Sequence, residues 1–209
     1  MIAPHPDDEA IGCGGSVCLH AARGNRVRAV FLTSGEAGLR HLSRDEAWRT
    51  REAEAEVAAG VLGLSALTFL RQPDWTLGDH IEATAAALTP HLIADAPDIV
   101  YLPHEGDWHP DHCVVLAIVR SALGGHAPVR TRFLTYETWA PLSAYDEAED
   151  VTQVMGQKLR ALRCHASQMT YYRYDRAVRG LNQYRGEMTR TRYAEVFRQV
   201  WPLEAGRTT

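Results

Sequence analysis

The chain has 209 residues, of which 45% are hydrophobic and 23% are charged, a balance typical of one ordinary globular domain and unlike that of disordered, collagen-like or coiled-coil chains. Its 22 basic and 26 acidic side chains leave a formal net charge of -4, so we expect no binding to nucleic acid or to an anionic membrane. The four cysteines include no C-x-x-C pair, no apolar run reaches about 18 residues, and the N-terminus lacks a signal-peptide pattern, which together favour a cytoplasmic location.

Predicted strands and helices alternate along most of the chain. The β-branched, apolar segment 26–33 predicts a strand. Ser43 and Glu46 form a capping-box pattern at the start of a helix that ends at Gly63. The same patterns predict strands at 66–70, 98–102 and 132–138, and helices at 78–94, 111–123 and 151–166. This alternation predicts an α/β fold, a Rossmann-like three-layer sandwich with a mostly parallel sheet covered on both faces.

The two ends of the chain are the least regular parts. Residues 1–4 contain only the end of a first strand, so we expect this strand to be shortened, either because upstream residues are missing from the sequence or because the strand is a stub. After about Ser167 the chain is rich in arginine and tyrosine, which fits either the lining of a polar cleft or a solvated helix that packs its tyrosine rings on the domain. We expect residues 1–209 to form a single domain, with a helical portion at about 151–209 packed on it.

The first chemically distinctive motif, His5-Pro6-Asp7-Asp8-Glu9, follows the end of the shortened strand. Ligands of parallel sheets bind at such strand ends. A histidine nitrogen and a carboxylate three residues later can bind one divalent ion such as zinc, while the adjacent carboxylate is free to accept a proton from a metal-bound water. The alternative is that the acidic residues only stabilise the N-terminus of the following helix. In that helix, Gly12-Cys13-Gly14-Gly15 lacks the spacing of a dinucleotide-binding loop and predicts close packing of the helix on the sheet.

A second motif, His109-Pro110-Asp111-His112, follows the predicted strand 98–102 through a short loop. Its histidines and its aspartate offer a third metal ligand, a second imidazole near a substrate, and a carboxylate that fixes the tautomer of a ring. The alternative is a polar, capped helix start. Because both motifs follow strands of one parallel sheet, we expect them to lie together. Three protein ligands leave a coordination position open for water, which is typical of a hydrolase and not of a structural zinc site.

Several further segments make the chain similar to a known family. The chain resembles the PIG-L or LmbE-like family of zinc-dependent N-acetylglucosaminyl deacetylases over most of its length. Besides the two motifs, the resemblance rests on Gly12-Cys13-Gly14-Gly15, residues 32–36, residues 50–52, residues 158–162 with His165, Ser167 and Gln168, and residues 193–197. His165 itself is expected to be a surface or packing residue.

The resemblance implies a role for most residues of the two motifs. Asp7 is expected to be the general base. A protonated His109 is expected to polarise the amide carbonyl and stabilise the oxyanion, with Asp111 holding its ring. One zinc ion per chain is expected to be bound by His5, Asp8 and His112.

Three other residues are expected to contact the substrate. Arg51 matches the family arginine that contacts the sugar hydroxyls or the aglycone; the alternative is a solvent-facing helix residue paired with Glu52 or Glu54. Asp107 stands where some relatives carry a tyrosine, and it either accepts a hydrogen bond from a substrate hydroxyl or only solvates the loop. Trp108 either stacks on a sugar ring or closes the core beneath the loop.

The leading hypothesis is a metal-dependent amidohydrolase that uses a zinc-activated water to remove an acetyl group from an N-acetylated amino sugar, an N-acetylglucosaminyl conjugate. One alternative is a non-catalytic sugar-binding module that retains the fold, although Asp7 and His109 are both present. Another is a metal-dependent phosphoester hydrolase, for which we would expect a dinuclear centre, whereas the sequence offers one complete ligand set. The sequence leaves open whether the chain forms a homo-oligomer, because no segment indicates the oligomeric state.

Overall fold

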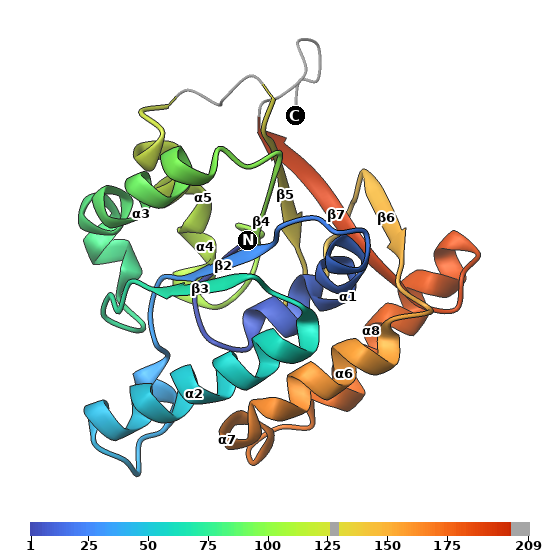
Figure 1. The fold of residues 1–209 in the computed structure, drawn as a ribbon, viewed down its shortest axis with the longest axis horizontal. Helices are drawn as coiled ribbons and strands as arrows, with labels where there is room; N and C mark the ends of the chain where they lie inside the picture. Colours follow the sequence, from blue (N-terminus) through green and yellow to red (C-terminus); the bar gives the residue numbers. More distant parts are fainter. Residues whose placement is uncertain (126–129, 202–209) are drawn as a thin grey trace.

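The central element of the fold is a sheet whose strands form two adjoining ladders (Figure 1). The computed structural model describes residues 1–125 and 130–201. The strands are β1 (Ile2–Ala3), β2 (Arg28–Phe31), β3 (Ala66–Phe69), β4 (Ile99–Pro103), β5 (Arg132–Tyr136), β6 (Glu147–Asp150) and β7 (Ala194–Trp201). The first ladder, β1-β2-β3, is parallel; in the second, β4-β5-β7-β6, β4 and β5 are parallel and β7 pairs antiparallel with β5 and β6. Because β1 packs beside β4, the ladders form the mostly parallel sheet that we expected.

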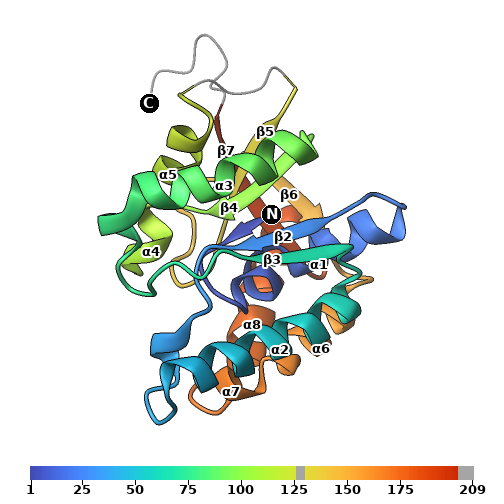
Figure 2. The ribbon, with the colours of Figure 1, turned by 60° about the vertical axis from the view of Figure 1, so that its left-hand side comes forward.

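Helices cover both faces of this sheet, which gives the predicted three layers (Figure 2). One face carries α1 (Asp8–Ala22), α2 (Arg44–Leu62), α6 (Met155–Cys164), α7 (Ala166–Met169) and α8 (Tyr174–Thr189), and the other carries α3 (Ile81–Asp95), α4 (Pro110–Cys113) and α5 (Val115–Ala122). Successive strand residues point to opposite faces. Tyr101 therefore packs in the core beneath α1 and α6, whereas Val100 and Leu102 pack in the core beneath α3 and α5.

Local sequence explains how several of these elements begin and pack. The capping box of Ser43 and Glu46 is present at the start of α2, and Gly63 ends that helix with a φ of 81°. The predicted close packing of α1 on the sheet is confirmed at Gly12, where a Cβ atom would lie 2.2 Å from the ring of Tyr136 on β5. These features fix α1 and α2 against the sheet.

Four segments differ from the prediction. The helix expected at 78–94 begins as a separate 3-10 turn, η2 (Leu77–His80), before α3. The helix expected at 111–123 is broken at Val114, whose φ and ψ of -101° and -6° separate α4 from α5.

The C-terminal portion is the third difference, because it is helical only as far as Thr189. Residues 194–201 form β7, and 202–209 lie outside the described range. Strand β6 was also not predicted, since its sequence EAED has no strand pattern. Its backbone pairing with β7 makes it a strand, a contact between distant segments that outweighs propensity.

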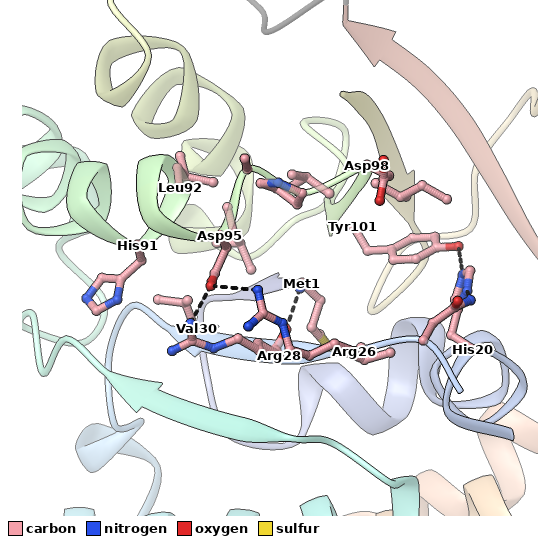
Figure 3. A pocket seen from close by; sticks show the side chains of 17 residues that line it. Met1, His20, Arg26, Arg28, Val30, His91, Leu92, Asp95, Asp98 and Tyr101 are labelled. Carbon is pink, nitrogen blue, oxygen red and sulfur yellow. Dashed lines mark hydrogen bonds and ion pairs between the residues drawn. The ribbon is translucent and has the colours of Figure 1, made fainter. Parts of the chain in front are cut away.

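A cavity of about 340 Å³ lies between β2 and β4, beyond the start of β1. Strand β1 has only two residues, as expected, whereas β2 and β4 have four and five. In Figure 3 the carboxylate of Asp95 faces the guanidinium groups of Arg26 and Arg28, and the amino group of Met1 donates to the Arg28 carbonyl. This cavity lies at the amino ends of the strands, so it is separate from the two motifs, which follow the carboxyl ends.

Candidate active site

The two motifs lie together at the carboxyl ends of β1 and β4, as the parallel sheet requires. The first motif forms the turn between β1 and α1. In this turn the backbone N–H of His5 donates to Asp8 Oδ2 at 2.9 Å. Asp7 has a φ of 126°, a strained conformation for a residue other than glycine. Such strain is characteristic of functional sites, where the surrounding contacts hold it in place.

Three donor atoms from the two motifs form a nearly equilateral triangle. His5 Nδ1 lies 3.3 Å from Asp8 Oδ2, which lies 3.2 Å from His112 Nε2, and the two nitrogens are 3.3 Å apart. Tetrahedral zinc with bonds of 2.0–2.1 Å separates its ligands by about 3.3 Å. The three side chains are buried and belong to the residue types that bind zinc. The donor set therefore fits a zinc ion.

In both histidines of the triangle, the ring nitrogen that points away from the triangle contacts a carboxylate. His112 Nδ1 lies 3.3 Å from Asp107 Oδ2, and His5 Nε2 lies 3.2 Å from Asp111 Oδ2 and 3.0 Å from Asp74 Oδ1. Carboxylates in these positions fix the orientation and tautomer of a metal-binding imidazole. Burial favours neutral His112, but the charge of Asp8 and the hydrogen bonds to Asp107 and Asp8 raise the pKa of His112 to about 9.

These contacts differ from two expectations from the sequence. Asp107 is buried and does not line the cavity described below, and it accepts hydrogen bonds from His112 and from the backbone N–H groups of His109 and Trp139. The carboxylate of Asp111 contacts His5 and the backbone of residues 75 and 77, whereas only its backbone N–H contacts the His109 ring. Both carboxylates are turned inward because they satisfy buried N–H groups of neighbouring loops.

Asp7 lies beside the triangle and is placed as a proton acceptor would be. Its side chain lines the adjacent cavity, and its Oδ2 is 3.3 Å from the guanidinium of Arg51. Burial raises the pKa of Asp7 to about 6, although the charge of Arg51 opposes this effect and that of Asp8 adds to it. A base with a pKa near the working pH is effective in proton transfer.

Arg51 is buried, so the solvent-facing alternative is wrong. Only 4% of the residue is exposed, and its guanidinium donates to the carbonyls of Gly35 and Pro6 at 2.8 and 2.5 Å. Glu52 and Glu54, its expected partners, bind other side chains. Arg51 also lines the cavity, and its buried Nε has no hydrogen-bond partner among the described residues.

Glu9 and His165 support Asp7 from the side facing the protein core. The backbone N–H of Asp7 donates to Glu9 Oε2 at 2.8 Å, and Glu9 Oε1 lies 2.6 Å from His165 Nε2. Burial lowers the pKa of His165, but the adjacent Glu9 carboxylate more than offsets this effect and raises it overall. His165 was expected to be a surface or packing residue. The role of His165 near the site could have been suspected from its position in the segment 158–168, which resembles the family.

His109 lines the cavity in a different protonation state from the expected one. Burial, followed by the charges of His5 and His112, lowers the pKa of His109 to about 4. This lowered pKa favours the neutral form of the His109 ring at neutral pH, whereas the sequence led us to expect a protonated ring. Because Nδ1 accepts the backbone N–H of Asp111 at 3.3 Å, the proton of the neutral ring resides on Nε2. A neutral His109 can still donate a hydrogen bond.

The cavity in front of these residues has a volume of about 830 Å³. Trp108 lines it and is 60% exposed, so it does not close the core. Eleven lining residues were not predicted as site residues, although the arginine- and tyrosine-rich segment had suggested a cleft and residues 74–75 follow the carboxyl end of a predicted strand. These residues are Ala37, Gly38, Arg40, His41, Asp74, Trp75, Trp139, Gln168, Tyr171, Tyr172 and Tyr174.

Comparison with known proteins gives a consistent result. Residues 1–123 match the family described as PIG-L, GlcNAc-PI de-N-acetylase. Diacetylchitobiose deacetylase from Thermococcus kodakarensis is 30% identical over 95% of this chain and 81% of that protein. A probable N-acetyl-alpha-D-glucosaminyl L-malate deacetylase 2 from Bacillus cereus is 29% identical over 80% of this chain and 82% of that protein. The structure of N,N'-diacetylchitobiose deacetylase from Pyrococcus horikoshii aligns with a TM-score of 0.83 at 27% identity, covering 95% of this chain and 82% of that chain.

The chain is an α/β protein with a cluster of histidine and carboxylate side chains that could hold a metal ion at the carboxyl end of its sheet. The chain belongs to the PIG-L family. This confirms the resemblance that the sequence motifs indicated. The two relatives and the solved structure described above carry deacetylase names. In the described part of the chain, no helix combines the length and the apolar character needed to cross a membrane.

Proposed function

We propose that this protein is a hydrolase that binds one zinc ion per chain and removes the acetyl group from an N-acetylated amino sugar, an N-acetylglucosaminyl conjugate. One observation carries the proposal: the triangle of His5, Asp8 and His112 fits tetrahedral zinc, and Asp7 stands beside it at the wall of a large cavity. The deacetylase names of the relatives support the reaction class.

Each residue at the cavity has a role that its contacts support. A zinc ion in this site supplies a water of lowered pKa and an electrophile for the amide carbonyl. Asp7 accepts a proton as the amide is attacked and returns it to the departing amine. His109 donates its Nε2–H to the oxygen of the carbonyl as negative charge develops there. Arg51 holds Asp7, and its guanidinium lies at the cavity wall, where it can contact the substrate beside Asp7.

The phosphoester alternative has less support from the described residues. Besides the triangle of His5, Asp8 and His112, two groups of described side chains are close enough to hold a metal: His5 with His109 and His112, and His5 with Asp74 and Asp111. Because all three groups use His5, they describe one centre and its supporting carboxylates, not the two separate ions of a dinuclear hydrolase.

Side-by-side assays of zinc-loaded protein test the proposed function. Acetate release from a panel of N-acetylglucosaminides is measured together with phosphate release from phosphoesters, before and after chelation. We expect acetate release that chelation abolishes and zinc restores. Phosphate release without acetate release would favour a phosphoester hydrolase, and bound zinc with neither product would favour the non-catalytic module.

A further inference from the structure

Charge is distributed very unevenly between the two parts of the chain. Residues 1–150 contain 22 acidic and 11 basic side chains, whereas residues 151–209 contain 4 acidic and 11 basic ones. The formal net charge of -4 is therefore the sum of a strongly acidic part and a strongly basic part. Opposite charges separated in this way favour contact with a partner whose surface is complementary.

Three exposed arginines, which we call the arginine row, follow one side of α8: Arg176, Arg179 and Arg190. They are spaced by about one and about three helical turns, so they lie on the same side of the helix. None of the three forms an ion pair with the described residues. The exposed part of α8 carries a single carboxylate, that of Glu187. The row is therefore a basic surface whose charge is not neutralised within the chain.

Two large apolar side chains lie beside the arginine row on the exposed part of α8. Tyr184 and Met188 are 56% and 58% exposed and are about one helical turn apart. Single exposed apolar residues are ordinary. Tyrosine, methionine and arginine are together enriched at protein interfaces, however, where apolar residues form the centre and polar residues the rim. The row, Tyr184 and Met188, which we call the α8 face, have this composition.

An acidic surface stands at the nearby edge of the sheet. Strand β6 is the last strand of the second ladder, and its outer edge pairs with no described strand (Figure 1). Residues 146–150 read DEAED, and Asp146 and Asp150 are exposed. Charged side chains on an edge strand disfavour backbone pairing with another strand. We therefore expect this edge to meet a partner through its carboxylates.

Tyr184 connects the arginine row with this acidic edge. The guanidinium of buried Arg185 lies 5.6 Å from the centre of the Tyr184 ring and 5.3 Å from that of the Tyr145 ring. Tyr145 directly precedes Asp146 in the chain. A surface that carries opposite charges on the two sides of an apolar centre is complementary to itself, because a two-fold rotation brings each charged side onto its opposite.

We propose that the α8 face is an interface with a second copy of this chain, related to the first by a two-fold axis near Tyr184. The arginine row of each copy faces the carboxylates of β6 in the other, and Tyr184 and Met188 of both copies pack at the centre. The net acidic charge of the chain disfavours a nucleic acid or an anionic membrane as the occupant. This inference does not depend on the metal site or on the proposed function.

Sedimentation velocity of the zinc-loaded full chain, measured over a range of protein concentrations, tests the dimer. We expect a species of two chains whose Kd increases at least tenfold when the salt concentration is raised from about 0.05 M to about 0.5 M. Tyr184→Ala should weaken the association roughly tenfold, because it removes an aromatic side chain from the centre. A mass of one chain at every protein and salt concentration would overturn the proposal.

Charge reversal tests which surfaces are in contact. Arg176→Glu with Arg179→Glu should weaken association at least ~100-fold, and Asp146→Arg with Asp150→Arg should do the same, because like charges then face each other. An equal mixture of the two double variants should associate again, since each reversed side meets an opposite charge. A Tm close to that of the wild type shows that each variant is folded.

A second double variant controls for the change in net charge. Arg49 on α2 and Arg120 on α5 are exposed outside the α8 face, so Arg49→Glu with Arg120→Glu should leave the association unchanged. Association that neither reversal weakens, or a mixture that stays monomeric, would overturn the proposed contact. A monomeric chain that sediments with anionic vesicles or with an oligonucleotide would assign the arginine row to a polyanion and would also overturn the dimer.

Discussion

At the residue scale, the distinction between a metal ligand and the carboxylate behind it depends on contacts that the sequence does not contain. Spacing indicated that His5 and a carboxylate three residues later could share one ion with a ligand from the second motif, because each motif follows a parallel strand. The resemblance to the family was needed to single out Asp8 and His112. The supporting role of Asp107 was not predictable. It depends on a loop that turns this side chain inward to His112 and to the backbone of Trp139, 32 residues away in the sequence.

Asp107→Asn should therefore weaken zinc binding without removing a ligand of the triangle. An amide in place of the carboxylate no longer fixes the His112 tautomer, and loss of such a partner typically lowers metal affinity 10–100-fold. Competition with a fluorescent zinc chelator measures the affinity. Asp45→Asn is the control, because its side chain is 64% exposed on α2. Equal affinities in Asp107→Asn and the wild type would exclude the supporting role.

Arg51 should influence the pH dependence of the reaction through Asp7. A protonated Asp7 cannot accept a proton, so activity falls as the pH decreases through its pKa. Burial raises that pKa to about 6 and the Arg51 charge opposes the rise, so Arg51→Gln should move the acid limb of kcat/KM to higher pH. Arg49→Gln, on the exposed side of the same helix, should not move it. An unchanged or lower limb in Arg51→Gln would show that Arg51 does not control the ionisation of Asp7.

At the scale of elements, the alternating pattern was sufficient to predict the parallel strands and the helices that cover them. The capping box and the close packing at the glycine motif could also be predicted from the sequence, because they act within one element or at a close contact. Strands β6 and β7 could not be predicted, because their pairing depends on partners distant in the sequence. Glu195 on β7 shows what this pairing positions: it accepts hydrogen bonds from Gly15, Ser16 and Lys158.

Removal of Glu195 should destabilise the fold strongly. Lys158 and Glu195 are 0% and 1% exposed, so Glu195→Ala leaves a buried charge without its partner, which typically lowers the free energy of unfolding by about 3–5 kcal/mol. Urea denaturation measures the loss. Glu149→Ala removes an exposed ion pair with Arg23 and should change stability by less than about 1 kcal/mol. Similar losses in the two variants would contradict a structural role for the buried pair.

At the scale of the whole molecule, contacts join the first motif to the C-terminal portion. His165 contacts Glu9, and Glu195 contacts the backbone of α1. The sequence suggested that this portion packs on the rest of the chain, but it did not indicate that the portion supports the residues around Asp7. Long-range contacts of this kind favour cooperative unfolding of the chain as one unit.

Zinc should therefore stabilise the entire chain and not only the loops of the site. At free zinc 1,000-fold above its Kd, the free energy of unfolding should rise by about 4 kcal/mol, and Tm by roughly 8–16 °C. Calorimetry with zinc and after chelation measures both quantities. We expect one transition in each case. Two transitions, with only one sensitive to zinc, would instead indicate that the C-terminal portion unfolds independently.

The most direct measurement is zinc content and acetate release on the same preparations of wild type, Asp7→Asn and Asp8→Asn. Wild type should hold one zinc ion per chain and release acetate from an N-acetylglucosaminide. Asp7→Asn should keep its zinc while its rate falls at least ~100-fold, because the proton acceptor is lost, whereas Asp8→Asn should lose zinc and activity together. Wild type that binds no zinc, or Asp7→Asn that works at the wild-type rate, would contradict the proposed zinc site and the role of Asp7.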